Sequence, residues 1–147
     1  MKVLIVGMGI GQLYKSIYEN KLYDVTTVDQ DKPADYWDIE QVDGEFDIAH
    51  ICTPNWTHGT IARTIADRCK IVFVEKPGLR TSDSWEALVH TFPNTRFAMV
   101  KNNQFRHNLP ELYIKARQSD KIILNWHNYN RVPVSYTHLR AHETVSH

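Results

Sequence analysis

Six short apolar runs rich in β-branched residues are spaced along the chain, and each has the length of a strand. They are KVLIV at 2–6, DVTTVD at 24–29, DIAHICTP at 47–54, KIVFVEKP at 70–77, RFAMVKN at 96–102 and KIILNWHNYN at 121–130. Between them lie stretches with helical character, at 11–20, 57–69, 82–91 and 110–119. This alternation predicts an α/β fold, in which helices cover both faces of a doubly wound parallel sheet.

Local signals agree with these boundaries. Thr81, Ser82 and Asp83 offer side-chain oxygens that can cap the helix at 82–91, and Pro110 suits a first helical turn. The segment 30–46 is polar and contains Pro33 and Gly44, so it predicts a loop with at most one short helix.

Composition excludes several classes of partner. The 147 residues include 17 basic and 17 acidic side chains, so bulk charge attracts neither nucleic acid nor an anionic membrane. The longest apolar runs have strand length, well below the roughly 20 residues of a membrane helix. Cys52 and Cys69 lack the spacing of metal ligands. We therefore expect a soluble cytoplasmic protein with reduced thiols and no metal site.

Three glycines, Gly7, Gly9 and Gly11, lie where the first strand passes into a helix that begins at about Ile10. Such a turn lets backbone amides approach a phosphate, and the helix N-terminus adds a favourable partial charge. Asp29 follows 18 residues after Gly11, about the separation at which a carboxylate binds the adenosine ribose. These residues predict a nucleotide-binding turn.

The type of coenzyme follows from the same acid. A carboxylate at Asp29 repels a 2′-phosphate, which favours NAD over NADP. Lys32 is a nearby cation that can offset part of this repulsion, so NADP stays an alternative. The spacing G-x-G-x-G, with Gln12 after the third glycine, also allows an S-adenosylmethionine-dependent methyltransferase. Against that alternative, Ile5 occupies the position where such enzymes normally carry an acid. A non-catalytic nucleotide-binding module is a third hypothesis.

Two further motifs follow the third and fourth predicted strands: TPNWTH at 53–58 and EKP at 75–77. In this order and spacing, the chain from residue 1 to about 133 resembles the N-terminal domain of the Gfo/Idh/MocA family, the glucose-fructose oxidoreductase and inositol dehydrogenase group. The resemblance implies a Rossmann-type fold and hydride transfer between NAD(P) and a sugar, inositol or related polyol. It also implies a homo-oligomeric parent protein.

The strand ends carry the candidate site residues, because ligands of open parallel sheets bind at the carboxyl ends of strands. Lys76 places a compact cation where it can stabilise a developing alkoxide. By resemblance, Lys76 is the active-site residue that contacts substrate, and Glu75 lies beside the nicotinamide. Further coenzyme contacts are expected at Thr53, Pro54, Asn55 and His58, and substrate contacts at Asn103, Gln104 and Arg106. His58 is near the start of a predicted helix, which favours packing or capping over catalysis for this residue. We interpret Tyr14, Tyr18, Tyr23, Trp56 and Trp85 as core or interface aromatics.

The end of the chain departs from the pattern. VSYTHLRAHET at 134–144 has neither strand nor helix periodicity and resembles a translated sequencing adapter, so its histidines are excluded from any site. We expect a dinucleotide-binding domain at 1–120, the first strand of a second α/β domain at 121–133 and a non-native tail at 134–147. Family members carry an aspartate and histidine pair in that second domain. The chain by itself is therefore expected to be inactive and to expose an unpaired sheet edge.

Overall fold

The computed structural model describes residues 1–100, and every structural statement below concerns that part of the chain. Five strands form its sheet: β1 (Lys2–Val6), β2 (Asp24–Val28), β3 (Phe46–Ile51), β4 (Cys69–Glu75) and β5 (Arg96–Val100). The α-helices are α1 (Gly11–Glu19), α2 (His58–Ile65) and α3 (Ser82–Thr91), and the 3₁₀ turns are η1 (Ile39–Gln41), η2 (Asn55–Thr57) and η3 (Ala66–Arg68).

All neighbouring strands of the sheet pair in parallel, in the order β2-β1-β3-β4-β5. Beyond β2, Tyr36 forms a single parallel bridge with Val28, at the place of a further edge strand. The chain moves from β1 outward to β2 and then returns to β3 on the other side of β1. The strand order therefore changes direction between β1 and β3, and this is where ligands bind in open α/β sheets.

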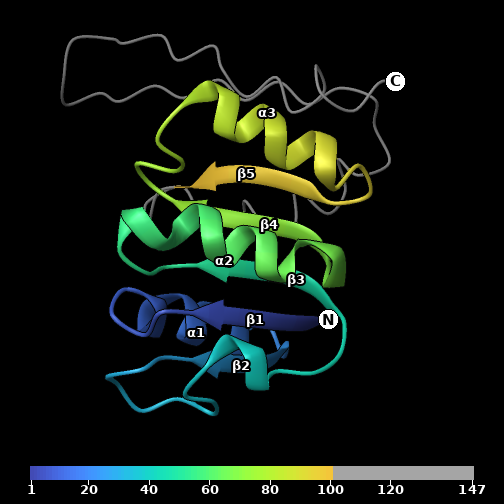
Figure 1. Cartoon of the computed structure of the whole chain (residues 1–147). Helices are drawn as coiled ribbons and strands as arrows, with labels where there is room; N and C mark the ends of the chain where they lie inside the picture. Colours follow the sequence, from blue (N-terminus) through green and yellow to red (C-terminus); the bar gives the residue numbers. More distant parts are fainter. Residues whose placement is uncertain (101–147) are drawn as a thin grey trace, which may run out of the picture.

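Alternate side chains of the strands point to opposite faces, and each face has its own core. Leu4, Val6 and Val72 pack with residues of α2 and α3, whereas Val3 and Ile5 pack with Tyr14 and Tyr18 of α1. Figure 1 shows the resulting layers, with α2 and α3 in front of the sheet and α1 behind it. The predicted doubly wound Rossmann-type α/β fold is confirmed.

The helix predicted at 57–69 is wrong in its bounds. The structure has η2, α2 and η3 in succession, and Cys69 already begins β4. The Thr95 hydroxyl lies 2.6 Å from the Ala66 carbonyl oxygen and 3.0 Å from that of Cys69, so it holds the chain where it leaves the helix. The side chain of Trp56 is 75% exposed, which excludes the core and leaves the interface alternative for this residue.

Other local predictions are confirmed. Helix α1 begins at Gly11 with Ile10 as its N-cap, and η1 is the one short helix in the described loop after β2. Thr81 caps α3, since its hydroxyl accepts the main-chain N–H of Ser84 at 3.2 Å. The strand predicted at 121–130 and the helix at 110–119 lie outside the described residues.

Candidate functional site

The glycine turn is packed tightly against the neighbouring strand end. Gly7 has φ +95°, and a Cβ there would lie 2.8 Å from the main chain of Cys52 and Thr53. Its N–H donates to the Val28 carbonyl at 2.8 Å. A residue with a side chain would strain the backbone and displace the loop after β3, so only glycine fits at this position.

Gly11 and Gly9 have different surroundings. A Cβ at Gly11 would lie 2.9 Å from Ile5 Cγ2, so this glycine lets α1 approach β1 closely. A Cβ at Gly9 would meet only Lys32 Cε, at 4.0 Å, so the backbone there borders open space. Gly11 thus serves the role that the third glycine has in the usual G-x-G-x-x-G spacing, and Gly9 is free for ligand approach.

The N-terminus of α1 is suited to an anion. No side chain caps it, and its first turn contains no acidic residue. The first N–H groups of a helix lack helical partners and point along a favourable dipole. Together with the open space at Gly9, this gives phosphate groups a place to bind, so the residues present fit a dinucleotide.

Asp29 connects the glycine turn to the loop after β2. Its Oδ2 accepts the Met8 N–H at 2.5 Å, and its Oδ1 accepts those of Asp31 and Lys32 at 2.7 and 2.8 Å. Partial burial acts to raise the pKa of this carboxyl, but these backbone bonds and the nearby Lys32 charge outweigh it and lower the pKa. Asp29 therefore stays charged and keeps a fixed orientation beside the turn.

His58 is a buried link between the two strand-end motifs. It is 1% exposed, with Nε2 2.8 Å from the Thr53 carbonyl oxygen and Nδ1 3.1 Å from that of Gly78. Both ring nitrogens thus face main-chain oxygens of the protein. This geometry favours the packing alternative for His58 and makes it a support of the loop that contains Pro54 and Asn55, which are both exposed.

Within the EKP motif, the acidic side chain of Glu75 is buried and the basic side chain of Lys76 is exposed. Glu75 is 5% exposed, and its carboxylate accepts the hydroxyl of Tyr14 and, through Oε2, the Lys76 N–H at 3.1 Å. The side chain of Lys76 is exposed, while its N–H also lies 3.0 Å from the Val100 carbonyl oxygen. The Lys76–Pro77 peptide bond is cis. The Gly78 N–H donates to the Glu75 carbonyl oxygen at 2.9 Å and closes the turn that follows β4.

The topology brings the predicted residues to one edge of the sheet. Gly7 to Gly11, Asp29, Thr53 to Asn55 and Glu75 to Lys76 follow or end β1, β2, β3 and β4, all at the carboxyl ends of the strands. The predicted contacts Asn103, Gln104 and Arg106 lie outside the described residues.

Sequence reasoning missed a role for Tyr14. It predicted an aromatic core residue, and Tyr14 is indeed fully buried, but its hydroxyl also donates to Glu75. The available signal was chemical: a buried tyrosine hydroxyl usually needs a hydrogen-bond partner. His50 was also missed. It stacks on Tyr14 with ring centroids 3.9 Å apart, and burial lowers its pKa to about 3, so it is neutral.

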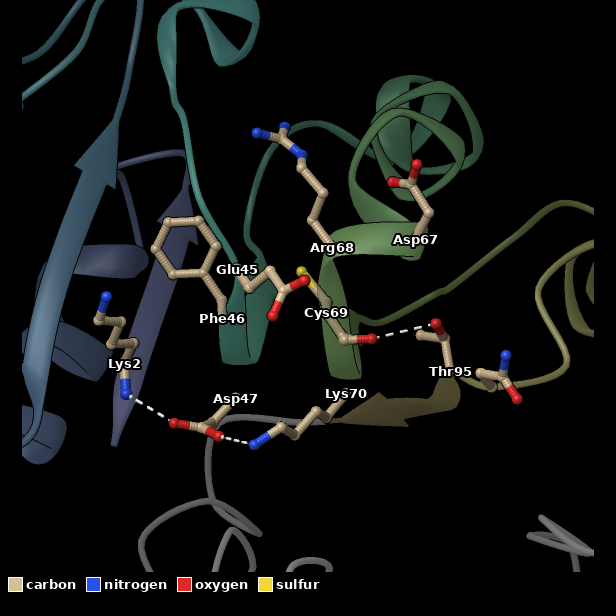
Figure 2. A pocket seen from close by; sticks show the side chains of 10 residues that line it. Lys2, Glu45, Phe46, Asp47, Asp67, Arg68, Cys69, Lys70 and Thr95 are labelled. Carbon is tan, nitrogen blue, oxygen red and sulfur yellow. Dashed lines mark hydrogen bonds and ion pairs between the residues drawn. The ribbon is translucent and has the colours of Figure 1, made fainter.

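A separate hollow of about 590 Å³ lies at the opposite edge, near the amino ends of β1, β3 and β4. In Figure 2, Asp47 lies between Lys2 and Lys70. Its carboxylate accepts the Lys2 main-chain N–H at 2.9 Å and pairs with Lys70 Nζ at 2.5 Å. Asp47 and Lys70 pair with each other, and none of the predicted strand-end residues lines this hollow, so it is not the candidate site.

Several solved structures that are similar to this chain are oxidoreductases. They include an oxidoreductase from Agrobacterium radiobacter in complex with NAD⁺, L-tartaric acid and magnesium, at 19% identity and a TM-score of 0.58, covering 69% of this chain and 35% of that one. The WlbA dehydrogenase from Chromobacterium violaceum, in complex with NADH and UDP-GlcNAcA, matches at 18% identity and a TM-score of 0.60. This match covers 82% of this chain and 40% of that one. Apo scyllo-inositol dehydrogenase from Lactobacillus casei matches at 17% identity and a TM-score of 0.60, and the match covers 82% of this chain and 43% of that one.

At these identities the structural matches establish the fold, and this chain spans less than half the length of each of those three proteins. The comparison with curated proteins gave no match. Within residues 1–100, no helix has the length and hydropathy needed to cross a bilayer. The family comparison is decisive, because residues 16–101, more than half of the chain, match the family described as "Oxidoreductase family, NAD-binding Rossmann fold". The chain belongs to the GFO_IDH_MocA oxidoreductase family, and the matched region is its NAD-binding Rossmann domain.

Proposed function

We propose that this chain is the coenzyme-binding part of an enzyme that transfers hydride between NAD(P) and a CH–OH group of a sugar, inositol or related polyol. One observation carries the proposal. The glycine turn, the charged Asp29 and the exposed Lys76 lie at the carboxyl edge of one sheet, on both sides of the point where the strand order changes direction.

The described residues can hold a dinucleotide in one direction. The open backbone at Gly9 and the uncapped start of α1 suit the pyrophosphate, and Asp29 after β2 suits the adenosine ribose. The other nucleoside then extends past Thr53 to Asn55 toward the end of β4. The charge of Asp29 favours NAD over NADP, and Lys32 near Gly9 is a cation that partly compensates. The coenzyme, when bound, supplies or accepts the hydride.

Lys76 is the proposed catalytic residue. Its exposed ammonium group can stabilise negative charge on the oxygen of a reacting alcohol. Of the three histidines within residues 1–100, His50 and His58 are buried and His90 lies in the last turn of α3. We therefore infer that a proton acceptor comes from outside residues 1–100. We also propose that the 147-residue chain turns over little by itself. In a full-length protein, Lys76→Met should reduce kcat by about 10²-fold or more while NADH affinity stays unchanged.

The substrate class is supported by relatives. One structural neighbour is a scyllo-inositol dehydrogenase, and another was solved with UDP-GlcNAcA. We propose a similarly hydroxylated substrate here, with Asn103, Gln104 and Arg106 as contacts. We further propose the domain limits 1–120 and 121–133, a non-native tail from residue 134, and a homo-oligomeric parent protein.

Calorimetry with NADH, NADPH and S-adenosylmethionine tests the coenzyme. We expect NADH to bind more tightly than NADPH, and S-adenosylmethionine not to bind. Membership of an NAD-binding oxidoreductase family already argues against the methyltransferase alternative. Tight binding of S-adenosylmethionine without binding of NADH would overturn the proposal.

The coding sequence of the gene distinguishes the proposed enzyme from the alternative, a non-catalytic nucleotide-binding module. Reading the coding sequence beyond codon 133 from independent DNA should give a continuous frame that encodes an aspartate and a histidine on one predicted helix. A native stop codon there would favour the module.

A further inference from the structure

Glu75 is held in a fixed position at the end of β4. It is the last residue of that strand and is 5% exposed. One carboxylate oxygen accepts the Tyr14 hydroxyl, and the other accepts the Lys76 N–H at 3.1 Å. A buried carboxylate needs such donors, because burial without hydrogen bonds strongly disfavours its charge.

The donor, Tyr14, comes from the helix that begins at the glycine turn. It lies in the first turns of α1, is fully buried, and is separated from Glu75 by 61 residues. Its ring stacks on His50 of β3, with centroids 3.9 Å apart and planes at 34°. His50 in turn lies 5.7 Å from Phe73 of β4, centroid to centroid. This packing fixes the Tyr14 ring, so its hydroxyl can hold Glu75 in one orientation.

Helix α1 thus serves both halves of the candidate site. Its N-terminus faces the open backbone at Gly9, and Tyr14 reaches under β3 to the end of β4. With Asp29 on the β2 side of the turn, the second nucleoside of a dinucleotide extends toward β3 and β4, where Glu75 and Lys76 lie.

We infer that Tyr14 is a positioning residue, whose hydroxyl orients the Glu75 carboxylate for recognition of the nicotinamide end of the coenzyme. This inference rests on the proposed function. A phenylalanine at this position would fill the same volume but would leave Glu75 with one donor fewer. The contribution of Tyr14 should then depend on whether the ligand carries a nicotinamide group.

The test compares NADH with ADP-ribose, which lacks nicotinamide, in calorimetric titrations of the 147-residue chain. For the unmodified chain we expect tighter binding of NADH than of ADP-ribose. Tyr14→Phe should weaken NADH binding about five- to tenfold and change ADP-ribose binding less than about twofold. Tyr18→Phe is the matched control. It removes another buried hydroxyl of α1, one that lies 3.4 Å from His50 Nδ1, and should leave the ratio of the two affinities unchanged.

Each outcome separates the two proposals. A purely structural role of Tyr14 predicts equal weakening of NADH and ADP-ribose, and that result would overturn the inference while leaving dinucleotide binding intact. Equal affinity of the unmodified chain for NADH and ADP-ribose would also overturn the inference while leaving dinucleotide binding intact. Absence of binding for both ligands would overturn the proposed function and this inference together. Circular dichroism confirms that each variant is folded under the titration conditions.

Discussion

At the residue scale, the three glycines of the turn perform different physical tasks. Gly7 combines φ +95° with backbone atoms 2.8 Å from a Cβ position, whereas a Cβ at Gly9 has open space. We expect Gly7→Ala to lower the free energy of unfolding by about 2 kcal/mol or more, because the backbone must adopt a strained conformation or shift. Urea denaturation measures this change.

Gly9→Ala is the matched variant. It should change the free energy of unfolding by less than about 0.5 kcal/mol, since the methyl group meets only Lys32 Cε at 4.0 Å. It should still weaken NADH binding about tenfold, because the added group stands where the backbone borders the ligand. Equal stability losses for the two variants would contradict these distinct roles.

Asp29 should make the free energy of unfolding depend on pH in the acidic range. Its pKa is lowered in the folded protein, so its bonds stabilise the fold above the ordinary carboxyl pKa of 3.8, and this contribution is lost as the pH falls through the lower folded value. Asp29→Asn should therefore destabilise the protein at pH 7 and have a smaller effect near pH 2. Urea titrations at both pH values measure the difference. Asp31→Asn, a change in an exposed neighbour that contributes only its N–H, is the control.

At the element scale, the Thr81 side chain determines how α3 begins. Its hydroxyl accepts the Ser84 N–H at 3.2 Å and also lies 2.9 Å from the Ser84 hydroxyl oxygen. Thr81→Ala should reduce the free energy of unfolding by about 1 kcal/mol, since it leaves an N-terminal N–H of the helix without its cap. Thr81→Ser keeps the oxygen and should recover most of the loss in thermal denaturation. No recovery would mean that the methyl packing of Thr81 matters instead.

Elements that depend on local patterns were predictable, and those set by distant contacts were not. The strand at 2–6 was predicted to the residue, because its apolar run lies in the sheet interior. The end of α2 was not, since Thr95 fixes it from 29 residues beyond Ala66. The same limit applies to the candidate site. The motifs place Asp29 and Lys76 at strand ends, but nothing local in the sequence pairs Tyr14 with Glu75.

At the scale of the whole molecule, the sheet keeps its two cysteines at opposite edges. Cys52 follows β3 beside Gly7 at the carboxyl edge, and Cys69 begins β4 at the amino edge. Burial, and then the charge of Glu75, raises the pKa of Cys52 well above its usual value. Burial raises the pKa of Cys69 to about 12. Both thiols should therefore be unreactive unless the domain opens.

Thiol labelling at pH 8 tests this expectation. We expect no fast reaction of the folded chain with a disulfide reagent, and two reactive thiols after unfolding in guanidinium chloride. NADH should slow the labelling of Cys52 more than that of Cys69, because Cys52 packs against the glycine turn while Cys69 lies at the far edge. Mass spectrometry of the labelled peptides resolves the two sites. Equal slowing would mean that both thiols react only through global unfolding, whereas fast labelling of the folded chain would contradict the burial of these side chains.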